Sequence, residues 1–247
     1  MTQITATLID SMGSDLSVVN AARVSFGKKS EWNPNFRDEK PLYERDAKLI
    51  KYLAKHKHLS PFGHAFASFH GKAPIFVGRQ LVKHKFLRWN EISRRYVDDE
   101  PEFYTPDVWR GRAEDVKQGS SSEAALASKG YFYYEYKDDD SEVPYKYQCG
   151  VDTPLKDVID DYNQRALALY TDMVDRLIAP EQARMVLPQS TMTEWHWSGS
   201  LDAFAAMCRL RCAPDTQLES RLVADDISAQ MRKLFPVSWA ALMGETE

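Results

Sequence analysis

Apolar residues recur at helical spacing along several stretches of the chain, and shorter stretches have the character of strands. The clearest helix follows Thr153-Pro154 and ends near Pro180, and its continuous apolar face indicates a helix that packs in the core. The apolar positions of that face are Leu155, Val158, Ile159, Tyr162, Ala166, Leu169, Tyr170, Met173 and Leu177.

The rest of the pattern predicts shorter elements on both sides of this helix. Asp15 is expected to cap a helix that runs through Ser25, with Leu16, Val19, Ala22 and Val24 as its apolar positions. Further helices are predicted over residues 43–57, 75 to about 85, 201–210 and 217–234, and strands over 5–12, 65–72 and 191–198, with a loop or strand entry over 90–96.

Residues 98–152 differ from the rest of the chain because no period is sustained through them. They contain Gly119-Ser120-Ser121-Ser122 and the acidic run Asp138-Asp139-Asp140, and an irregular insertion is therefore predicted. A chain of 247 residues is long enough for one sizeable core, so the prediction is a single α+β domain over residues 1–247.

Composition narrows the class of protein. The formal net charge of −4 gives the whole molecule no bias toward nucleic acid, so any anion site must be local. Three cysteines without a CxxC pair favour a reducing compartment, and the absence of a signal peptide or a long apolar run favours a cytoplasmic protein that does not enter the membrane.

One segment, Arg79 to Arg95, concentrates positive charge in this acidic chain. It holds Arg79, Lys83, Lys85, Arg88, Arg94 and Arg95 together with His84. If a helix carries Gln80 and Lys83 one turn apart and a loop follows, donors converge on something small and anionic, such as a nucleotide monophosphate. Charge alone leaves a second interpretation open, in which the segment is a solvated basic face of a helix.

The order of residues in this region resembles the flavin-dependent thymidylate synthase family. The family usually has arginine-histidine-arginine, seven residues and a serine, and here Lys83-His84-Lys85 is followed by seven residues and Ser93. The resemblance extends to GSDLSVVNAARVSF at 13–26, HLSPFGHAFASF at 58–69, ARMVLPQS at 183–190 and LRCAPDTQLESR at 210–221.

This resemblance implies a fold and a reaction. The fold would have a mixed or antiparallel sheet flanked by long helices. The enzyme would methylate dUMP to dTMP with FAD as cofactor, NADPH as reductant and 5,10-methylenetetrahydrofolate as carbon donor. Family enzymes are homotetramers with shared active sites, so a homotetramer is expected here. Lysine replaces arginine at both ends of the triad, and an ammonium group cannot reproduce a planar two-pronged guanidinium.

The resemblance also assigns site residues. FAD contacts would come from a turn, the triad and the start of a helix, and they are His58, Ser60, Lys83, His84, Lys85, Glu91 and Ser200. The dUMP contacts would be Gln80, Lys83, Glu91, Ser93, Arg94, Arg95, Arg184 and Arg211. Ser93 and Arg95 should take the phosphate, and Arg211 should polarise the uracil ring.

The sequence lacks the motifs that are typical of several other kinds of site. Neither G-x-G-x-x-G after a strand nor G-x-x-x-x-G-K-[ST] occurs, so FAD would need another cradle. Cys149, Cys208 and Cys212 are not in a Pro-Cys setting, and each is predicted to be a small buried hydrophobe rather than a nucleophile. The histidines show no zinc-ligand spacing, so no metal is expected, and the Trp195–Trp197 and Tyr131–Tyr136 clusters are expected to pack rather than to stack on bases.

Two alternative functions stay open at this point. The basic segment 79–95, with its interleaved aromatic residues, would also suit a nucleic-acid-binding module. The lysines of the triad would also suit a flavoprotein that kept the fold and lost thymidylate synthesis.

Overall fold

The computed structural model describes residues 4–34, 41–97, 99–112, 120 and 154–245. These residues group into two compact units. The first, here called the sheet unit, consists of residues 3–73, 77–92 and 193–247, and the second, the α4 unit, contains residues 74–76 and 93–192. Most of the predicted insertion over 98–152, with Tyr131–Tyr136 and Cys149, lies outside the described residues.

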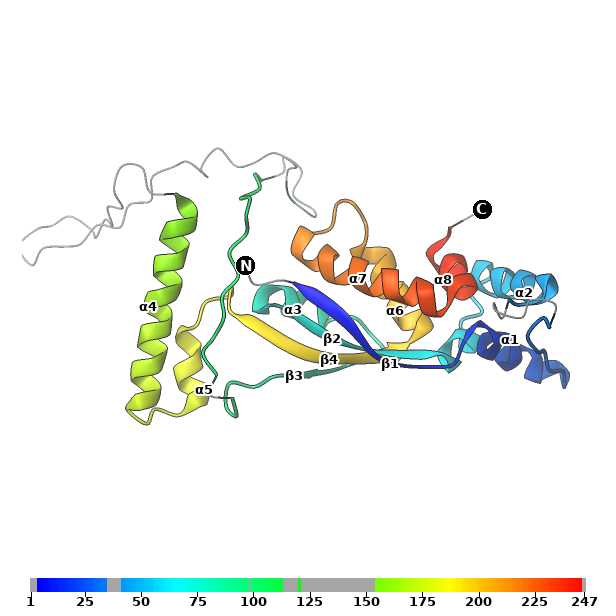
Figure 1. The fold of residues 1–247 in the computed structure, drawn as a ribbon, viewed down its shortest axis with the longest axis horizontal. Helices are drawn as coiled ribbons and strands as arrows, with labels where there is room; N and C mark the ends of the chain where they lie inside the picture. The colour runs from blue at the N-terminus through cyan, green and yellow to red at the C-terminus, as the bar shows by residue number, and fades with distance from the viewer. Residues whose placement is uncertain (1–3, 35–40, 98, 113–119, 121–153, 246–247) are drawn as a thin grey trace, which may run out of the picture. The chain divides into compact units, whose positions relative to one another are not determined.

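Among the described residues, strands are separated by single helices or by groups of helices (Figure 1). The first half holds β1 (Thr5–Met12), α1 (Asp15–Arg23), η1 (Val24–Phe26), α2 (Glu44–Lys55), η2 (Ser60–His64), β2 (Phe66–Pro74), α3 (Ile75–Leu81) and β3 (Leu87–Glu91). The second half holds α4 (Leu155–Asp175), α5 (Pro180–Ala183), η4 (Arg184–Val186), β4 (Met192–Ser200), α6 (Leu201–Arg211), α7 (Leu218–Leu234) and α8 (Pro236–Met243).

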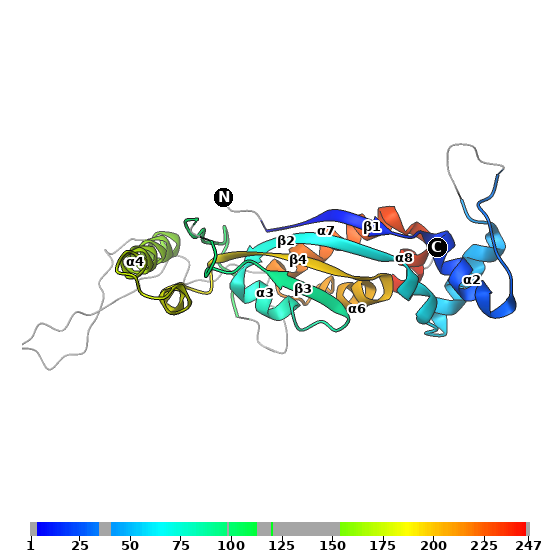
Figure 2. The same ribbon diagram turned by 90° about the horizontal axis from the view of Figure 1, so that it is seen from below.

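The sheet has the strand order β1-β2-β4-β3, and both β1–β2 and β3–β4 are antiparallel pairs. The predicted α+β class with an antiparallel sheet is confirmed. Helices α6 and α7 cover one face of the sheet, with α7 packed against β1, and Figure 2 shows the strands in front of these helices.

Alternation along β2 and β4 separates an apolar from a polar face. Trp197 on β4 and Phe69 on β2 are buried and both meet the ring of Phe204 on α6 edge-on, at centroid distances of 5.6 and 5.2 Å. The buried Trp195 and Trp197 confirm that this cluster packs in the core. A side chain at Gly71 would overlap the indole of Trp195, so only glycine fits there.

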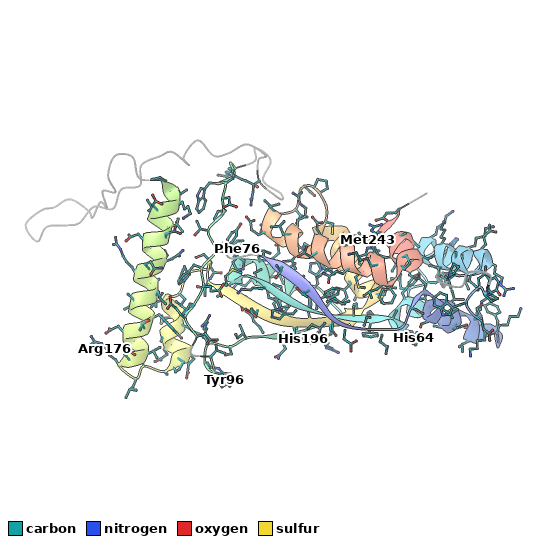
Figure 3. The ribbon with its side chains drawn as sticks, viewed as in Figure 1. His64, Phe76, Tyr96, Arg176, His196 and Met243 are labelled. Atoms are coloured by element: carbon teal, nitrogen blue, oxygen red, sulfur yellow. The ribbon has the colours of Figure 1, made fainter. Side chains whose placement is uncertain are left out.

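The opposite face of the sheet carries polar pairs. Ser68 and Ser198 share a hydrogen bond of 2.9 Å, and Glu194 lies 2.8 Å from His70 and 3.5 Å from Lys72. Figure 3 labels His196 on this side of the sheet, away from α7. The period-2 pattern therefore places charge and hydroxyl groups on one face and the core on the other.

Three predictions about helices are wrong. The helix from residue 15 ends at Arg23 instead of Ser25, and Val24, expected in its apolar stripe, is 74% exposed in η1. The helix from residue 75 ends at Leu81 instead of about Lys85, and residues 87–91 form β3. Pairing with β4 explains this strand, because it stacks Trp89 on Trp195 with ring centroids 4.4 Å apart.

The third correction concerns the long helix α4. It spans Leu155–Asp175, but its predicted core face is only partly buried. Val158, Ala166 and Tyr170 are buried together with Asn163, whereas three predicted core residues are exposed, namely Tyr162, Leu169 and Leu177. Leu177 lies beyond the end of the helix with a left-handed φ of 63°, so helical spacing does not apply to it.

Asp15 has a different role from the predicted one. Ser14 is the N-cap of α1, whereas Asp15 is buried and accepts hydrogen bonds from Val237 N at 3.0 Å and Ser238 N at 2.9 Å. Its carboxylate thus caps the N-terminus of α8 from another part of the chain, where the helix dipole favours an anion.

Asp15→Ala should lower the free energy of unfolding by about 2 kcal/mol, because two buried N–H groups lose their acceptor. Asp15→Asn, which keeps one oxygen acceptor, should lose about half as much. Urea denaturation measures both variants. A loss for Asp15→Ala within about 0.5 kcal/mol of zero, as at an ordinary surface position, would contradict the capping role.

Candidate active site

The contact between Arg211 and His84 joins the end of α6 to the turn that follows α3. The Nε of Arg211 donates a hydrogen bond of 3.0 Å to Nε2 of His84. A histidine nitrogen that accepts must carry its lone pair, so His84 is neutral with its proton on Nδ1. This leaves the Nδ1–H of His84 and the terminal NH groups of Arg211 as donors toward a bound molecule.

The environment of His84 favours this neutral state. Burial, followed by the positive charge of Arg211, lowers the pKa of His84 from 6.5 to about 4. Burial also lowers the pKa of Arg211, but a guanidinium keeps its charge at neutral pH. The pair therefore presents one fixed positive charge supported by a neutral imidazole.

Two other predicted residues of the sheet unit are held by side chains of neighbouring elements. Gln80 on α3 accepts a hydrogen bond from the buried Ser220 on α7. Glu91, at the end of β3, accepts from the hydroxyl of Thr193 at 2.7 Å and from the indole of Trp89 at 3.1 Å. These bonds fix an amide and a carboxylate on the rigid elements of the sheet unit.

Lys83 and Lys85 lie in the turn between α3 and β3 and are exposed. The expectation that a helix carries Gln80 and Lys83 one turn apart is wrong, because α3 ends at Leu81. Phe86, also in this turn, is 84% exposed with a left-handed φ of 65°, an uncommon conformation for a bulky residue. The Lys83-His84-Lys85 triad thus lies on a tight turn.

A cavity of about 890 Å³ lies beside α1 and α2, and His58 and Ser60 both line it. The ring of His58 is nearly parallel to that of Tyr52, with centroids 6.3 Å apart. Figure 3 labels His64 at the end of the same η2 turn. Most of the remaining lining residues come from α1, η1 and α2 and include Arg23, Phe26, Arg45, Lys48 and Leu49, and Lys28 follows η1.

This cavity contains site candidates that the sequence did not single out. Lys28, Arg45 and Lys48 bring positive charge to its wall, and Phe26 and Tyr52 bring aromatic surface. Arg45, Lys48 and Tyr52 are spaced three and four residues apart on α2, so helical spacing would have placed them on one face of that helix.

A buried carboxylate connects the chain segments that form the walls of this cavity. Asp46 is fully buried, and its Oδ1 accepts from the hydroxyl of Ser30 at 3.0 Å and from the guanidinium of Arg23. The segment after α1 and the start of α2 are therefore joined by charge-assisted bonds, which fix the shape of the cavity.

The α4 unit holds the remaining dUMP candidates. Ser93 Oγ accepts from the backbone N of Arg95 at 3.4 Å, and the guanidinium of Arg95 donates to the hydroxyl of Tyr96 at 2.9 Å. Arg94 donates to the carbonyl of Asp99. Arg184, at the start of η4, is exposed. Ser93 and Arg95 thus share one loop, and Arg184 stands on a separate element.

Ser200, predicted to contact FAD, is the N-cap residue of α6 in the sheet unit. Its hydroxyl donates a hydrogen bond of 2.6 Å to Asp202 in the first turn of the helix. No contact in the described chain tests its assignment to the cofactor, which stays a prediction.

Comparison with known proteins decides the family. A family model described as thymidylate synthase complementing protein matches residues 7–237. The chain belongs to the flavin-dependent thymidylate synthase family. An enzyme of this name from Thermus thermophilus is 35% identical over 234 residues, which cover 95% of this chain and 73% of the relative. One from Treponema denticola is 35% identical over 237 residues, covering 95% and 77%.

A solved structure gives the same result at the level of fold. The UMP/dUMP methylase PolB from Streptomyces cacaoi, bound with 5-Br dUMP, matches with a TM-score of 0.74 and 30% identity, covering 98% of this chain and 96% of that one. The resemblance inferred from the Lys83-His84-Lys85 region, and the expectation of an enzyme, are therefore confirmed. Neither the nucleic-acid-binding module nor the flavoprotein without synthase activity gains support from these matches.

Cys208 and Cys212 are the two cysteines in the described part of the chain. Cys208 is buried, as predicted, and burial raises the pKa of its thiol well above the ordinary value. Cys212 is only half-buried, so the prediction of a buried hydrophobe is wrong for it. It follows Arg211 at the end of α6, where packing is looser than in the middle of the helix.

No group of three or more histidine, cysteine, aspartate or glutamate side chains in the described chain is placed to hold a metal ion. Among the same residues, no helix is long and apolar enough to cross a membrane.

Proposed function

We propose that this protein forms dTMP from dUMP, with FAD as its cofactor, NADPH as reductant and 5,10-methylenetetrahydrofolate as carbon donor. The observation that carries the proposal is the family match over residues 7–237, which includes the His58–Ser60 turn, the Lys83–Ser93 segment and Arg211. The curated relatives are named flavin-dependent thymidylate synthases, and PolB is a UMP/dUMP methylase bound with a dUMP analogue.

The cavity beside α1 and α2 has properties that suit FAD. Its volume of about 890 Å³ lies within the usual range for cofactor sites. Lys28, Arg45 and Lys48 would bind the pyrophosphate, and Phe26 and Tyr52 would pack against ring systems. When bound, the flavin would carry a hydride from NADPH to the methylene carbon on its way to becoming the methyl group of dTMP.

Ser60 and His58 would hold the cofactor from the η2 side of this cavity, and Lys83, His84 and Lys85 belong to the turn before β3. These two groups of residues lie on different elements of the sheet unit. We propose that an FAD site is completed by both groups in a homotetramer, with different subunits supplying them. Ser200, at the N-terminus of α6, and Glu91, at the end of β3, would serve the same cofactor.

For dUMP, the proposed contacts divide between base and phosphate. Arg211 would bind the uracil edge and stabilise the negative charge that develops in the ring as its carbon attacks the methylene carrier. Gln80, Lys83 and Glu91 would orient the nucleotide. Ser93, Arg94, Arg95 and Arg184 would bind the phosphate, because three guanidinium groups and a hydroxyl suit a doubly charged group.

Arg95→Ala should weaken dUMP binding by about 2 kcal/mol, because one charge-assisted bond to the phosphate is lost. FAD binding should change little. Isothermal titration with dUMP measures the effect, and Arg176→Ala is a matched control because Arg176 is an exposed arginine of the same unit paired with Asp172. Equal dUMP affinity in the Arg95 variant and the wild type would remove Arg95 from the site.

The cofactor assignment has a direct test. Purified protein should carry a visible flavin spectrum that NADPH bleaches under anaerobic conditions. Arg45→Ala combined with Lys48→Ala should purify with less flavin, because two cations leave the cavity wall. Protein that never binds FAD, or a double variant that retains FAD as well as the wild type, would contradict this cofactor site.

A further inference from the structure

Two hydrogen bonds join the same two stretches of the sheet unit. Ser220 donates to the amide oxygen of Gln80, and Arg211 donates to His84 at 3.0 Å. Gln80 and His84 are four residues apart around the end of α3, and Arg211 and Ser220 flank the loop between α6 and α7. The amide of Gln80 is therefore held within one turn of chain of the Arg211–His84 pair.

The loop between α6 and α7 is fixed by its own hydrogen bonds. The hydroxyl of the buried Thr216 donates to Leu210 O at 2.9 Å. Arg221, in the first turn of α7, donates to Pro214 O at 2.9 Å. Both ends of the loop are therefore held in place, and the two hydrogen bonds to α3 and its turn come from fixed positions.

Packing of α7 does not explain a serine at position 220. The residue is fully buried and stands in a stripe that continues with the apolar Ala224, Ile227 and Met231. Alanine would suit such a position and has the higher helix propensity. A buried hydroxyl costs free energy unless it is hydrogen-bonded, and the partner of this one is Gln80. The hydroxyl is therefore explained by its bond to Gln80.

This bond determines which end of the Gln80 amide meets a bound molecule. A glutamine amide has an oxygen that accepts and an NH2 group that donates. Because the oxygen accepts from Ser220, the NH2 group of this half-buried side chain is the end left for a ligand. His84 offers its Nδ1–H, and Arg211 offers its terminal NH groups because its Nε is occupied by His84. All three side chains thus present donors.

We propose that Ser220 is a positioning residue that makes the enzyme select uracil over cytosine. The inference rests on the proposed function, which brings a pyrimidine nucleotide to Arg211. Uracil has a carbonyl oxygen at the position where cytosine has an amino group. An amino group that faces another donor leaves both without an acceptor, which costs free energy in a desolvated site. Fixing the Gln80 amide as a donor therefore disfavours cytosine.

Binding of dUMP and dCMP to the flavin-loaded protein measures this selection without turnover. Isothermal titration with dUMP, and displacement of dUMP by dCMP, give both dissociation constants. The wild type should bind dUMP about a hundredfold more tightly than dCMP. In Ser220→Ala the amide can rotate and offer its oxygen to the amino group of cytosine, so the ratio should fall to about tenfold or less.

Two further variants distinguish positioning from a structural role. Ser228→Ala is the matched control, because Ser228 lies on the same helix and its hydroxyl accepts from the indole of Trp239 at 3.1 Å. It should keep the full preference for dUMP. If Ser220 acts only through Gln80, Ser220→Ala combined with Gln80→Ala should bind both nucleotides as Gln80→Ala alone does. A loosened fold would instead add its loss to that of Gln80→Ala and lower the melting temperature.

The outcomes separate this inference from the proposed function. A Ser220→Ala variant that keeps the hundredfold preference, or losses that add in the double variant, overturns the role of Ser220 even in an enzyme that forms dTMP. A wild type that binds dUMP and dCMP equally overturns it as well. A preference for dUMP that depends on Ser220, in a protein that forms no dTMP, supports the positioning role and overturns the proposed function.

Discussion

Replacing Arg211 with alanine is expected to lower dTMP formation by about two to three orders of magnitude while the flavin stays bound. The guanidinium is placed to meet negative charge as it develops on the uracil ring, and such a donor acts mainly in the transition state. Its Nε is occupied by His84 at 3.0 Å, so its terminal NH groups remain for the ring edge. NADPH oxidation should persist in the variant, because the half-reaction on the flavin needs no charge on the uracil.

Arg211→Lys gives the matched comparison. It should recover only part of the lost rate, because an ammonium keeps the charge but lacks the planar pair of donors. A structural role for Arg211 at the end of α6 predicts different damage, in which melting temperature, flavin content and turnover fall together. Measuring both half-reactions and the melting temperature of each variant separates these roles, and near-wild-type dTMP formation by Arg211→Ala would remove Arg211 from the chemistry.

His84→Leu is expected to lower dTMP formation about a hundredfold, because Arg211 loses the acceptor that fixes its orientation. His84→Gln offers an amide oxygen in place of Nε2 and should restore about tenfold of that loss. The effect should fall mainly on kcat, with the melting temperature close to that of the wild type. Equal kcat in the leucine and glutamine variants would show that His84 does not position Arg211 through a hydrogen bond.

The pKa of His84 gives this prediction a readout that packing alone would not move. In the folded protein the pKa is lowered to about 4, below the ordinary 6.5, so the imidazole is neutral above pH 5 and accepts from Arg211. Between pH 6.5 and 4 the unfolded chain binds the proton more readily, so His84 makes the fold less stable as the pH falls through that window. NMR titration should show the His84 pKa rising in Arg211→Ala while staying below 6.5, since burial is the larger cause.

Much of the fold follows from local patterns. The apolar spacing of residues 43–57 and 217–234 predicted α2 and α7 to within about two residues, because each buries one stripe of side chains. β3 was missed because its five residues depend on pairing with β4 and on the stack of Trp89 against Trp195. Asp15 was assigned to its own helix because its true partner, α8, lies more than 220 positions further along the chain.

Only part of the candidate site could be predicted from the sequence. The family resemblance selected both His84 and Arg211, but these residues lie 127 positions apart and no local pattern encodes their contact. Likewise, the family resemblance selected His58 and Ser60 in their turn. Arg45, Lys48 and Tyr52 have the sequence pattern of an ordinary polar helix face. Only the fold shows that they line the same cavity as His58 and Ser60.

Formation of dTMP by the purified protein tests the central claim most directly. Reaction mixtures with dUMP, NADPH, FAD and 5,10-methylenetetrahydrofolate would be followed by chromatography, in parallel with mixtures that each lack one component and with Arg211→Ala. The account predicts dTMP only in the complete mixture, and about two to three orders of magnitude less with the variant. A flavin-loaded wild type that forms no dTMP from the complete mixture, or an Arg211→Ala enzyme as fast as the wild type, would contradict it.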